Sequence, residues 1–146
     1  MQKLAEIQLS YKPSLKDSPT IQSSHDAYLS LMDYYPEETI GLQERFVVLY
    51  LNNANRVIGV QVLSIGGLTG TVADIRLVYA TALKVMAAGL IVSHNHPSYL
   101  LRPSEQDKRL TKKLKEAGEL LDIKLLDHLI ISPNNDYLSF SDEGHI

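Results

Sequence analysis

The stretch that most constrains this chain is residues 90–107, where a short apolar run leads into a loop crowded with polar residues. The run LIVSH, residues 90–94, has the β-branched pattern of a central buried strand. Its end delivers His94 and His96 to the loop, and ligand sites in open α/β sheets lie at such strand ends. The sequence therefore predicts an α/β fold with a candidate site at the end of this strand.

The segments on either side predict further strands. Residues 45–65, RFVVLYLNNANRVIGVQVLSI, place two apolar runs around NNANR, whose residues tolerate positive φ, and so predict a β-hairpin. Residues 123–132, IKLLDHLIIS, predict another strand, and residues 134–140, NNDYLSF, predict a turn and a short last strand. Near the N-terminus, residues 4–11 alternate loosely and predict a strand, followed by an extended connector rich in Pro, Ser and Lys.

Three segments carry helix signals. Ser23 or Ser24 can cap a short helix that ends before Pro36. Asp74 is the candidate N-cap of a helix that follows a Gly-rich entry and stops at Gly89, and its apolar residues predict burial along much of its surface. A third helix, SEQDKRLTKKLKEAGELLD, combines an apolar stripe with a mostly separate basic face. The stripe contains Leu110, Leu114, Ala117 and Leu121, and the basic residues are Lys108, Arg109, Lys112, Lys113 and Lys115.

Composition limits the class of protein. With 146 residues, 45% of them hydrophobic and 21% charged, the chain has the size of one domain with a real core. A formal net charge of −3 argues against a protein that coats nucleic acid through bulk positive charge. The N-terminus has no apolar signal segment, and no run approaches the roughly 20 apolar residues of a membrane span. We expect a soluble, unexported, cytoplasmic protein without a membrane partner.

The polar loop contains candidate ligands for a metal ion. His94 and His96 are two positions apart in an extended segment, so their side chains point to the same side, and Asp107 can add a carboxylate. Because the chain has no cysteine, a zinc site must use imidazole and carboxylate ligands. A simpler interpretation competes, because Ser104 and Asp107 behind Pro103 also match a capping box without catalytic meaning. His-x-His is common by chance as well, so it is the combination that favours a metal site.

The motif HNHPSYLLRPSEQD, residues 94–107, reads His-x-His-Pro, six residues, Ser, two residues, Asp, and resembles the JAMM motif of the MPN-domain metalloproteases. Together with KEAGELLDIKLLDHLII it more closely resembles the RadC-like branch of that superfamily, over residues 45–142. The resemblance implies a cytidine-deaminase-like α/β fold, a mixed β-sheet flanked by helices. We expect an N-terminal strand and extended arm at residues 1–24 and a RadC-like JAB domain at residues 25–146.

The resemblance also implies a function. It implies a zinc-dependent, metallopeptidase-like hydrolase that acts on a peptide, isopeptide or related amide through a metal-activated water. The implied zinc ligands are His94, His96 and Asp107, with water as the fourth ligand and Ser104 helping to stabilise the oxyanion. A hydroxyl donor beside developing negative charge suits that last role. The RadC-like branch further implies an association with DNA repair.

One catalytic position departs from the family pattern. Zinc peptidases of this type use an upstream glutamate to take a proton from the water, and counting back from Gly66 and Gly67 places that position at Gln61. An amide cannot accept and release a proton near neutral pH, so a step worth about 10²–10⁴ in rate would be missing. Glu44 is the nearest upstream carboxylate, at the far end of the first hairpin strand. Gln61 therefore favours a second hypothesis, a catalytically impaired metal-binding scaffold.

Two further residues and two partners have competing interpretations. Tyr99 stands where RadC-like proteins commonly have glycine, so its ring either narrows the mouth of the site or offers a phenol donor. His128 lies in a predicted buried strand and fits a structural histidine better than a ligand.

The basic helix face gives weak support for nucleic-acid binding, since such a face is more often solvated. The arm and the strand edges would suit a homodimer.

Overall fold

A five-stranded mixed β-sheet forms the centre of the protein. The structure, a computed structural model, describes residues 3–66 and 73–146. The strands are β1 (Arg45–Leu51), β2 (Val57–Ile65), β3 (Gly89–Asn95), β4 (Lys124–Ser132) and β5 (Asp136–Ser139). Their order across the sheet is β2-β1-β3-β4-β5, with β3 and β4 parallel and the other neighbours antiparallel.

The hairpin predicted for residues 45–65 is present as β1 and β2. Its turn is built by asparagines. The side-chain oxygen of Asn52 accepts hydrogen bonds from the N–H groups of Ala54 and Arg56, and Asn55 adopts a φ of 58°. Asparagine tolerates that left-handed conformation better than most residues, so the turn reverses the chain with little strain.

β3 is the central strand and is buried along its whole length, as its β-branched run predicts. On one side β1 pairs Phe46 with His94, and on the other β4 pairs Ile130 with the same residue. A parallel neighbour needs a crossover connection, and α3 (Glu105–Leu121) provides it between β3 and β4. The strand end that carries the histidines is therefore fixed from both sides.

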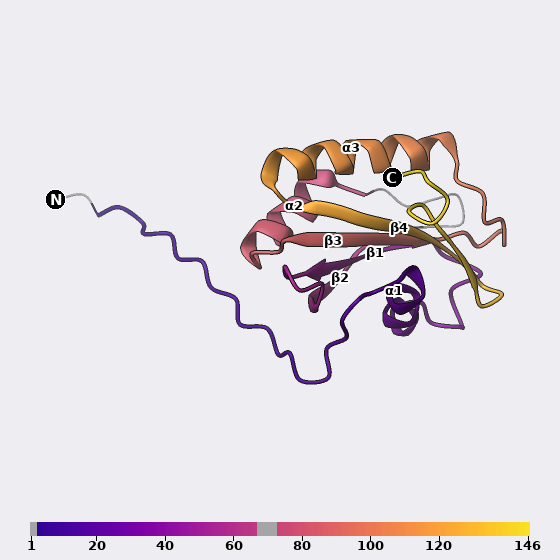
Figure 1. Ribbon diagram of the computed structural model, residues 1–146, viewed down its shortest axis with the longest axis horizontal. Helices are drawn as coiled ribbons and strands as arrows, with labels where there is room; N and C mark the ends of the chain where they lie inside the picture. The colour runs from indigo at the N-terminus through magenta and orange to yellow at the C-terminus, as the bar shows by residue number, and fades with distance from the viewer. Residues whose placement is uncertain (1–2, 67–72) are drawn as a thin grey trace.

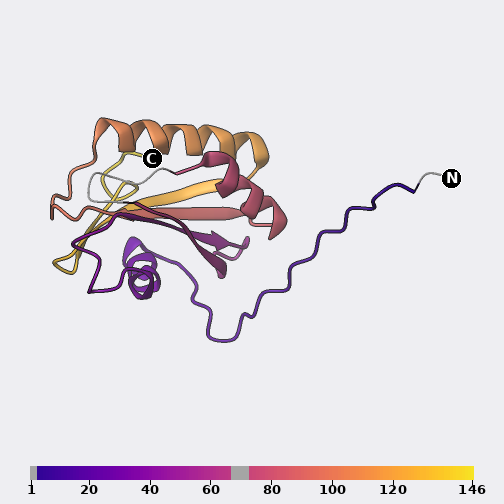
Figure 2. The same cartoon turned by 180° about the vertical axis from the view of Figure 1, so that it is seen from behind.

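Helices cover both faces of this sheet (Figures 1 and 2). α2 (Ile75–Lys84) and α3 lie over one face. α1 (Ser24–Leu31), followed by the short 3₁₀ helix η1 (Met32–Tyr34), lies over the opposite face. One cluster of buried hydrophobic residues joins α1 to the sheet, and a second joins α2 and α3 to it. The architecture is the expected α/β fold with a mixed sheet flanked by helices.

The predicted helix starts are confirmed. Ser23 caps α1, Asp74 caps α2 and Ser104 caps α3, each accepting a hydrogen bond from a backbone N–H of the first turn. α1 and η1 end before Pro36, as predicted. None of the helices in the described part of the chain has the length and apolar composition needed to cross a membrane.

α2 differs from the prediction at its end and in its burial. The helix ends at Lys84 rather than at Gly89, because Met86 adopts a left-handed φ of 57° and turns the chain into β3. Leu77 and Leu83 are 44% and 48% exposed, so the helix buries one face and not most of its surface. Residues 67–72, which contain most of the Gly-rich entry, lie outside the described residues.

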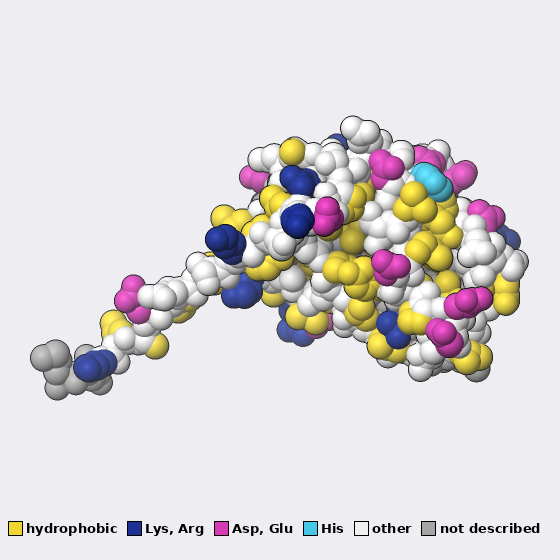
Figure 3. Space-filling view, turned by 90° about the horizontal axis from the view of Figure 1, so that it is seen from below, with side chains coloured by type: hydrophobic (Ala, Val, Ile, Leu, Met, Phe, Trp, Pro, Cys, Tyr) yellow, Lys and Arg dark blue, Asp and Glu magenta, His cyan; other side chains and the backbone are white. Residues whose placement is uncertain are grey.

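The strand predicted for residues 4–11 is absent. These residues run away from the body of the molecule as an extended arm (Figures 1 and 3). Leu4 and Ile7 are 91% and 86% exposed, and the sheet order includes no strand from this segment. A strand needs a backbone partner, which the loose alternation of the sequence cannot supply by itself. The arm meets the domain where the Tyr11 hydroxyl donates to the carbonyl oxygen of Ile58 at 2.5 Å.

Candidate metal centre

The end of β3 turns two histidines to one side of the sheet. His94 and His96 flank Asn95, whose side chain points to the opposite face because strand residues alternate. Asn95 is fully buried, and its Nδ2 donates to the carbonyl oxygens of Ile40 and Gln43 at 2.8 Å each. These bonds anchor the strand end, so the residue between the two histidines helps to hold both of them in register.

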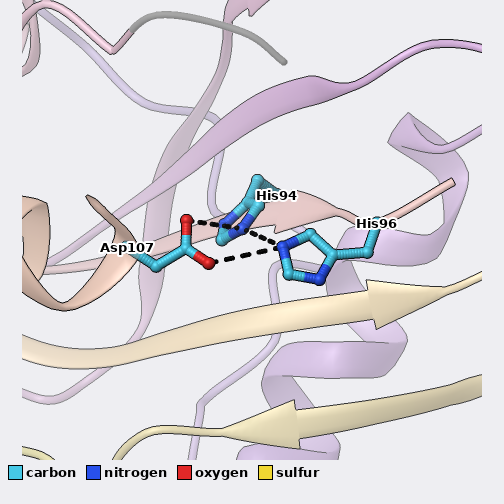
Figure 4. A group of neighbouring side chains, drawn as sticks. All are labelled: His94, His96 and Asp107. Carbon is cyan, nitrogen blue, oxygen red and sulfur yellow. Dashed lines mark hydrogen bonds and ion pairs between the residues drawn. The ribbon is translucent and has the colours of Figure 1, made fainter. Parts of the chain in front are cut away.

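Asp107 reaches the histidines from the start of α3. The Ser104 hydroxyl accepts a hydrogen bond from the Asp107 N–H at 3.0 Å, and Asp107 Oδ2 accepts one from the Ser104 N–H at 2.8 Å. The same carboxylate places Oδ1 3.3 Å from His94 Nε2 and Oδ2 3.4 Å from His96 Nε2 (Figure 4). The capping box is therefore real, and it aims the carboxylate at the histidines. Helix capping and a metal-ligand role do not exclude each other here.

The spacing of the three side chains suits a metal ion. One ligand atom from each lies within 4.8 Å of the others, and the two histidine Nε2 atoms are 2.9 Å apart. Ligands of a tetrahedral zinc site with bonds of about 2.0–2.1 Å are separated by about 3.3 Å. The separation of 2.9 Å between the two Nε2 atoms and those of 3.3 Å from His94 to Oδ1 and 3.4 Å from His96 to Oδ2 are close to that value, so the two imidazoles and the carboxylate converge on one point where a metal ion could bind.

The charges in the cluster favour binding of a cation. Burial acts to raise the pKa of Asp107, but hydrogen bonds with His94 and His96 outweigh it and hold the pKa well below its ordinary value. Burial acts to lower the pKa of His96, but hydrogen bonds with Asp107 and with the carbonyl of Leu100 outweigh it and raise the pKa. The short distance between the two Nε2 atoms requires one of them to carry a proton, which a metal ion would replace.

His128 stands directly behind His94, a position that sequence reasoning did not assign. It is fully buried in β4, and its Nε2 lies 2.8 Å from His94 Nδ1. Burial, followed by the charge of His94, lowers the pKa of His128 well below its ordinary value. The possible ligand cluster among the described residues consists of His94, His96 and Asp107, and the structural role of His128 stays a prediction. A lone histidine in the apolar run LLDHLII was the only signal for this contact in the sequence.

Glu44 lies closer to the cluster than its place in the hairpin suggests. β1 is antiparallel to β3, so the start of β1 lies beside the end of β3, and the Arg45 N–H donates to the Asn95 side chain at 2.7 Å. The charge of Glu44 is one of the influences that raise the pKa of His96. Glu44 is at the far end of the first hairpin strand, as described from the sequence, and the antiparallel pairing of β1 with β3 makes this the end that lies beside the histidines.

Gln61 lies on β2, two strands away from β3 in the sheet. It pairs with Val48, which pairs with Val92, two residues before His94. Adjacent strands are about 4.8 Å apart, so β2 lies about 10 Å from β3. The Oε1 atom of Gln61 accepts a hydrogen bond from the Tyr50 hydroxyl at 2.9 Å. The structure does not bring Gln61 into contact with the histidine and aspartate cluster.

Tyr99 bends the loop between the histidines and α3. Its φ is 72°, a left-handed conformation that disfavours residues with a Cβ, and its N–H donates to the His96 carbonyl at 3.1 Å. The tight turn lets the Leu100 carbonyl accept a hydrogen bond from His96 Nδ1 at 2.7 Å. Tyr99 is 52% exposed, so its ring lies at the surface.

The fold and the cluster define a JAB-type α/β domain with a candidate His-His-Asp metal centre. The chain matches the model of the RadC-like JAB domain over residues 21–145. The chain belongs to this family, and the resemblance of its motif is confirmed.

Several curated proteins are similar to the chain. It is 51% identical over 124 residues to a UPF0758 protein of Flavobacterium johnsoniae, covering 85% of this chain and 52% of the relative. It is 39% identical over 141 residues to a UPF0758 protein of Porphyromonas gingivalis, covering 97% and 62%. It is 37% identical over 124 residues to one of Chlorobaculum tepidum, covering 85% and 54%. The chain thus spans little more than half the length of these relatives.

Proposed function

We propose that the protein is a zinc-dependent hydrolase that cleaves a peptide, isopeptide or related amide bond. The observation that carries this proposal is the convergence of two imidazoles and a carboxylate. His94 Nε2 lies 2.9 Å from His96 Nε2 and 3.3 Å from Asp107 Oδ1, and His96 Nε2 lies 3.4 Å from Asp107 Oδ2. A zinc ion held there would supply Lewis acidity and lower the pKa of a water molecule toward neutrality.

The chain supplies a proton acceptor for this chemistry at Glu44. Glu44 immediately precedes β1, at the end of that strand that lies beside the end of β3, and its charge is one of the influences that raise the pKa of His96. Glu44 would take a proton from the attacking water and return it to the leaving nitrogen, a role that an amide side chain cannot perform. The catalytic position assigned to Gln61 on sequence alone is therefore transferred to Glu44 in this proposal.

Ser104 supplies a donor for the developing oxyanion. Its hydroxyl oxygen accepts the Asp107 N–H, and this bond leaves the hydroxyl proton free to point elsewhere. The residue is exposed as the N-cap of α3, three residues before Asp107. A hydroxyl donor at the place where negative charge develops stabilises the transition state more than the ground state.

The proposal is tested by combining metal analysis with an amide-cleavage screen. Protein purified without added metal or a histidine tag is analysed for zinc and then screened against fluorogenic peptide and isopeptide libraries. We expect about one zinc per chain, lost in His96→Ala, and turnover that falls about 10²–10⁴-fold in Glu44→Gln. The matched variant Gln61→Glu is expected to leave turnover unchanged. A Gln61→Glu protein that gains activity where the native protein has none would contradict the assignment.

The metal-binding scaffold is the alternative outcome of the same experiment. Stoichiometric zinc without turnover on any amide would favour it, with zinc contributing to stability and not to catalysis.

Nucleic-acid binding stays a prediction with weak support. Two lysines of the basic face of α3 lie near glutamates, Lys108 with Glu105 at 3.5 Å and Lys112 with Glu116 at 4.0 Å. These pairs reduce the positive charge that the face offers to phosphates.

A further inference from the structure

A chain of hydrogen bonds runs behind the candidate metal centre, through three elements of the fold. His94 Nδ1 lies 2.8 Å from His128 Nε2, and His128 Nδ1 lies 2.7 Å from Thr111 Oγ1. Thr111 Oγ1 in turn lies 2.9 Å from the backbone carbonyl oxygen of Asp107, one turn earlier in α3. The chain therefore begins at one candidate ligand, crosses β4, and ends at the residue that carries another.

The last hydrogen bond of this series determines which atom donates in each of the others. A backbone carbonyl can only accept, so the single hydroxyl proton of Thr111 points to Asp107. The Thr111 oxygen must then accept from His128 Nδ1, and the buried neutral ring presents a lone pair at Nε2. That lone pair accepts a hydrogen bond from the N–H at His94 Nδ1. A neutral His94 is left with its own lone pair at Nε2, the atom that faces His96 and Asp107.

The surroundings leave the two rings little freedom to adopt another arrangement. His128 and Thr111 are 0% and 3% exposed, so water does not offer either of them a substitute partner. Phe140 stacks on His128 with ring centroids 4.5 Å apart. Phe46 lies nearly parallel to the His94 ring, 6.3 Å away. Leaving a donor of this buried chain without an acceptor would cost the desolvation free energy of that group.

We infer that Thr111 and His128 are positioning residues that fix the tautomer and orientation of His94, so that its Nε2 lone pair is presented to a divalent metal ion. The inference rests on the proposed metal site but concerns residues that do not touch the metal. His96 Nδ1 also donates, directly to the carbonyl of Leu100 at 2.7 Å, and without metal its Nε2 carries the proton that lies between it and His94 Nε2. Hydrogen-bonding partners behind a ligating histidine generally serve this purpose.

Thr111→Val tests the inference with Thr111→Ser as its matched control. Valine has nearly the shape of threonine but cannot accept from His128, whereas serine keeps the hydroxyl. The first measurement is ¹⁵N NMR of the imidazole nitrogens in metal-free full-length protein, at one pH for all variants. We expect His94 protonated at Nδ1 in the native chain and in Thr111→Ser, and a mixed or reversed tautomer in Thr111→Val.

The second measurement is zinc affinity by competition with a chromophoric chelator, with zinc ion alone as the probe. We expect affinity to fall about 10–100-fold in Thr111→Val and to stay within a few-fold in Thr111→Ser. Urea unfolding of the metal-free variants identifies any loss of zinc affinity that comes only from a less stable fold. An unchanged tautomer in Thr111→Val would overturn the inference. If the native protein binds no zinc, the proposed function fails, but the tautomer measurement still decides the role of Thr111 and His128.

Discussion

Gly118 lies where α3 packs closely against Ile123 and Tyr79, and Gly118→Ala is a sharp test of that packing. A Cβ at this position would lie 2.2 Å from the carbonyl oxygen of Ile123 and 2.8 Å from the Tyr79 hydroxyl. The Ile123 N–H also donates to the Gly118 carbonyl at 2.9 Å, so the backbone there cannot move without breaking the helix end. The added methyl group must therefore displace α3 or the turn into β4.

Two opposing effects set the magnitude. Alanine is favoured over glycine inside a helix by about 1 kcal/mol, which alone would stabilise the variant. Overpacking costs about 1–3 kcal/mol, and contact with a backbone carbonyl places Gly118→Ala at the upper end of that range. The net expectation is a loss of about 2 kcal/mol in the free energy of unfolding. For a chain of this size that corresponds to a fall in Tm of about 4–8 °C.

Urea unfolding and thermal melting of metal-free protein measure this change, with Gly41→Ala as the control. A Cβ at Gly41 would meet no atom within 4 Å, so that substitution should be neutral or slightly stabilising. If Gly118→Ala proved as stable as the native chain, the close approach of α3 to β4 would be wrong. The position of Asp107 at the other end of the helix would then need revision as well.

Three further perturbations address the site. Saturating zinc at about 1,000 times its Kd should stabilise the native protein by about 4.1 kcal/mol, and a melting curve of His96→Ala that rises equally with zinc would refute the ligand assignment. Ser104→Ala should cost about 1 kcal/mol through loss of the cap, whereas Ser104→Asp should restore most of it, as measured by urea unfolding. Tyr99→Gly should raise Tm slightly, because relief of the left-handed φ is worth about 1–2 kcal/mol and glycine entropy offsets part of it. The neighbouring Ser98→Gly should lower Tm, and equal effects of the two substitutions would contradict the strain argument.

The parts of the site that the sequence predicts well are those set by local rules. His94 and His96 share a side because strand residues alternate, and Asp107 lies at the third position of a capped helix. Both features depend on at most four consecutive residues, so the pattern of residue types is sufficient. The central burial of β3 was likewise readable, because only a strand covered on both faces tolerates the run LIVSH.

The parts that the sequence misses depend on which strands become neighbours. His128 meets His94 only because β4 pairs parallel with β3, and Glu44 approaches the site only because β1 runs antiparallel to it. Neither pairing is encoded in a local pattern. The end of α2 was also misplaced, since Met86 takes the left-handed conformation for which Gly89 was the stronger local candidate. The strand predicted for residues 4–11 is absent for a different reason. An alternating local pattern is present there, but it does not guarantee a partner strand.

The placement of all three candidate ligands around one short loop determines how the protein would respond to metal loss. His94 and His96 precede the loop and Asp107 follows it, so a bound ion would tie the exit of β3 to the entrance of α3. A crosslink over so few residues removes little chain entropy, so its main effect is to fix the angle of the crossover. Amide hydrogen exchange after chelation should therefore accelerate in residues 96–107 first. The amide groups of the β1–β2 hairpin should stay protected from exchange. The metal would then stabilise the loop locally, within a sheet that folds without it.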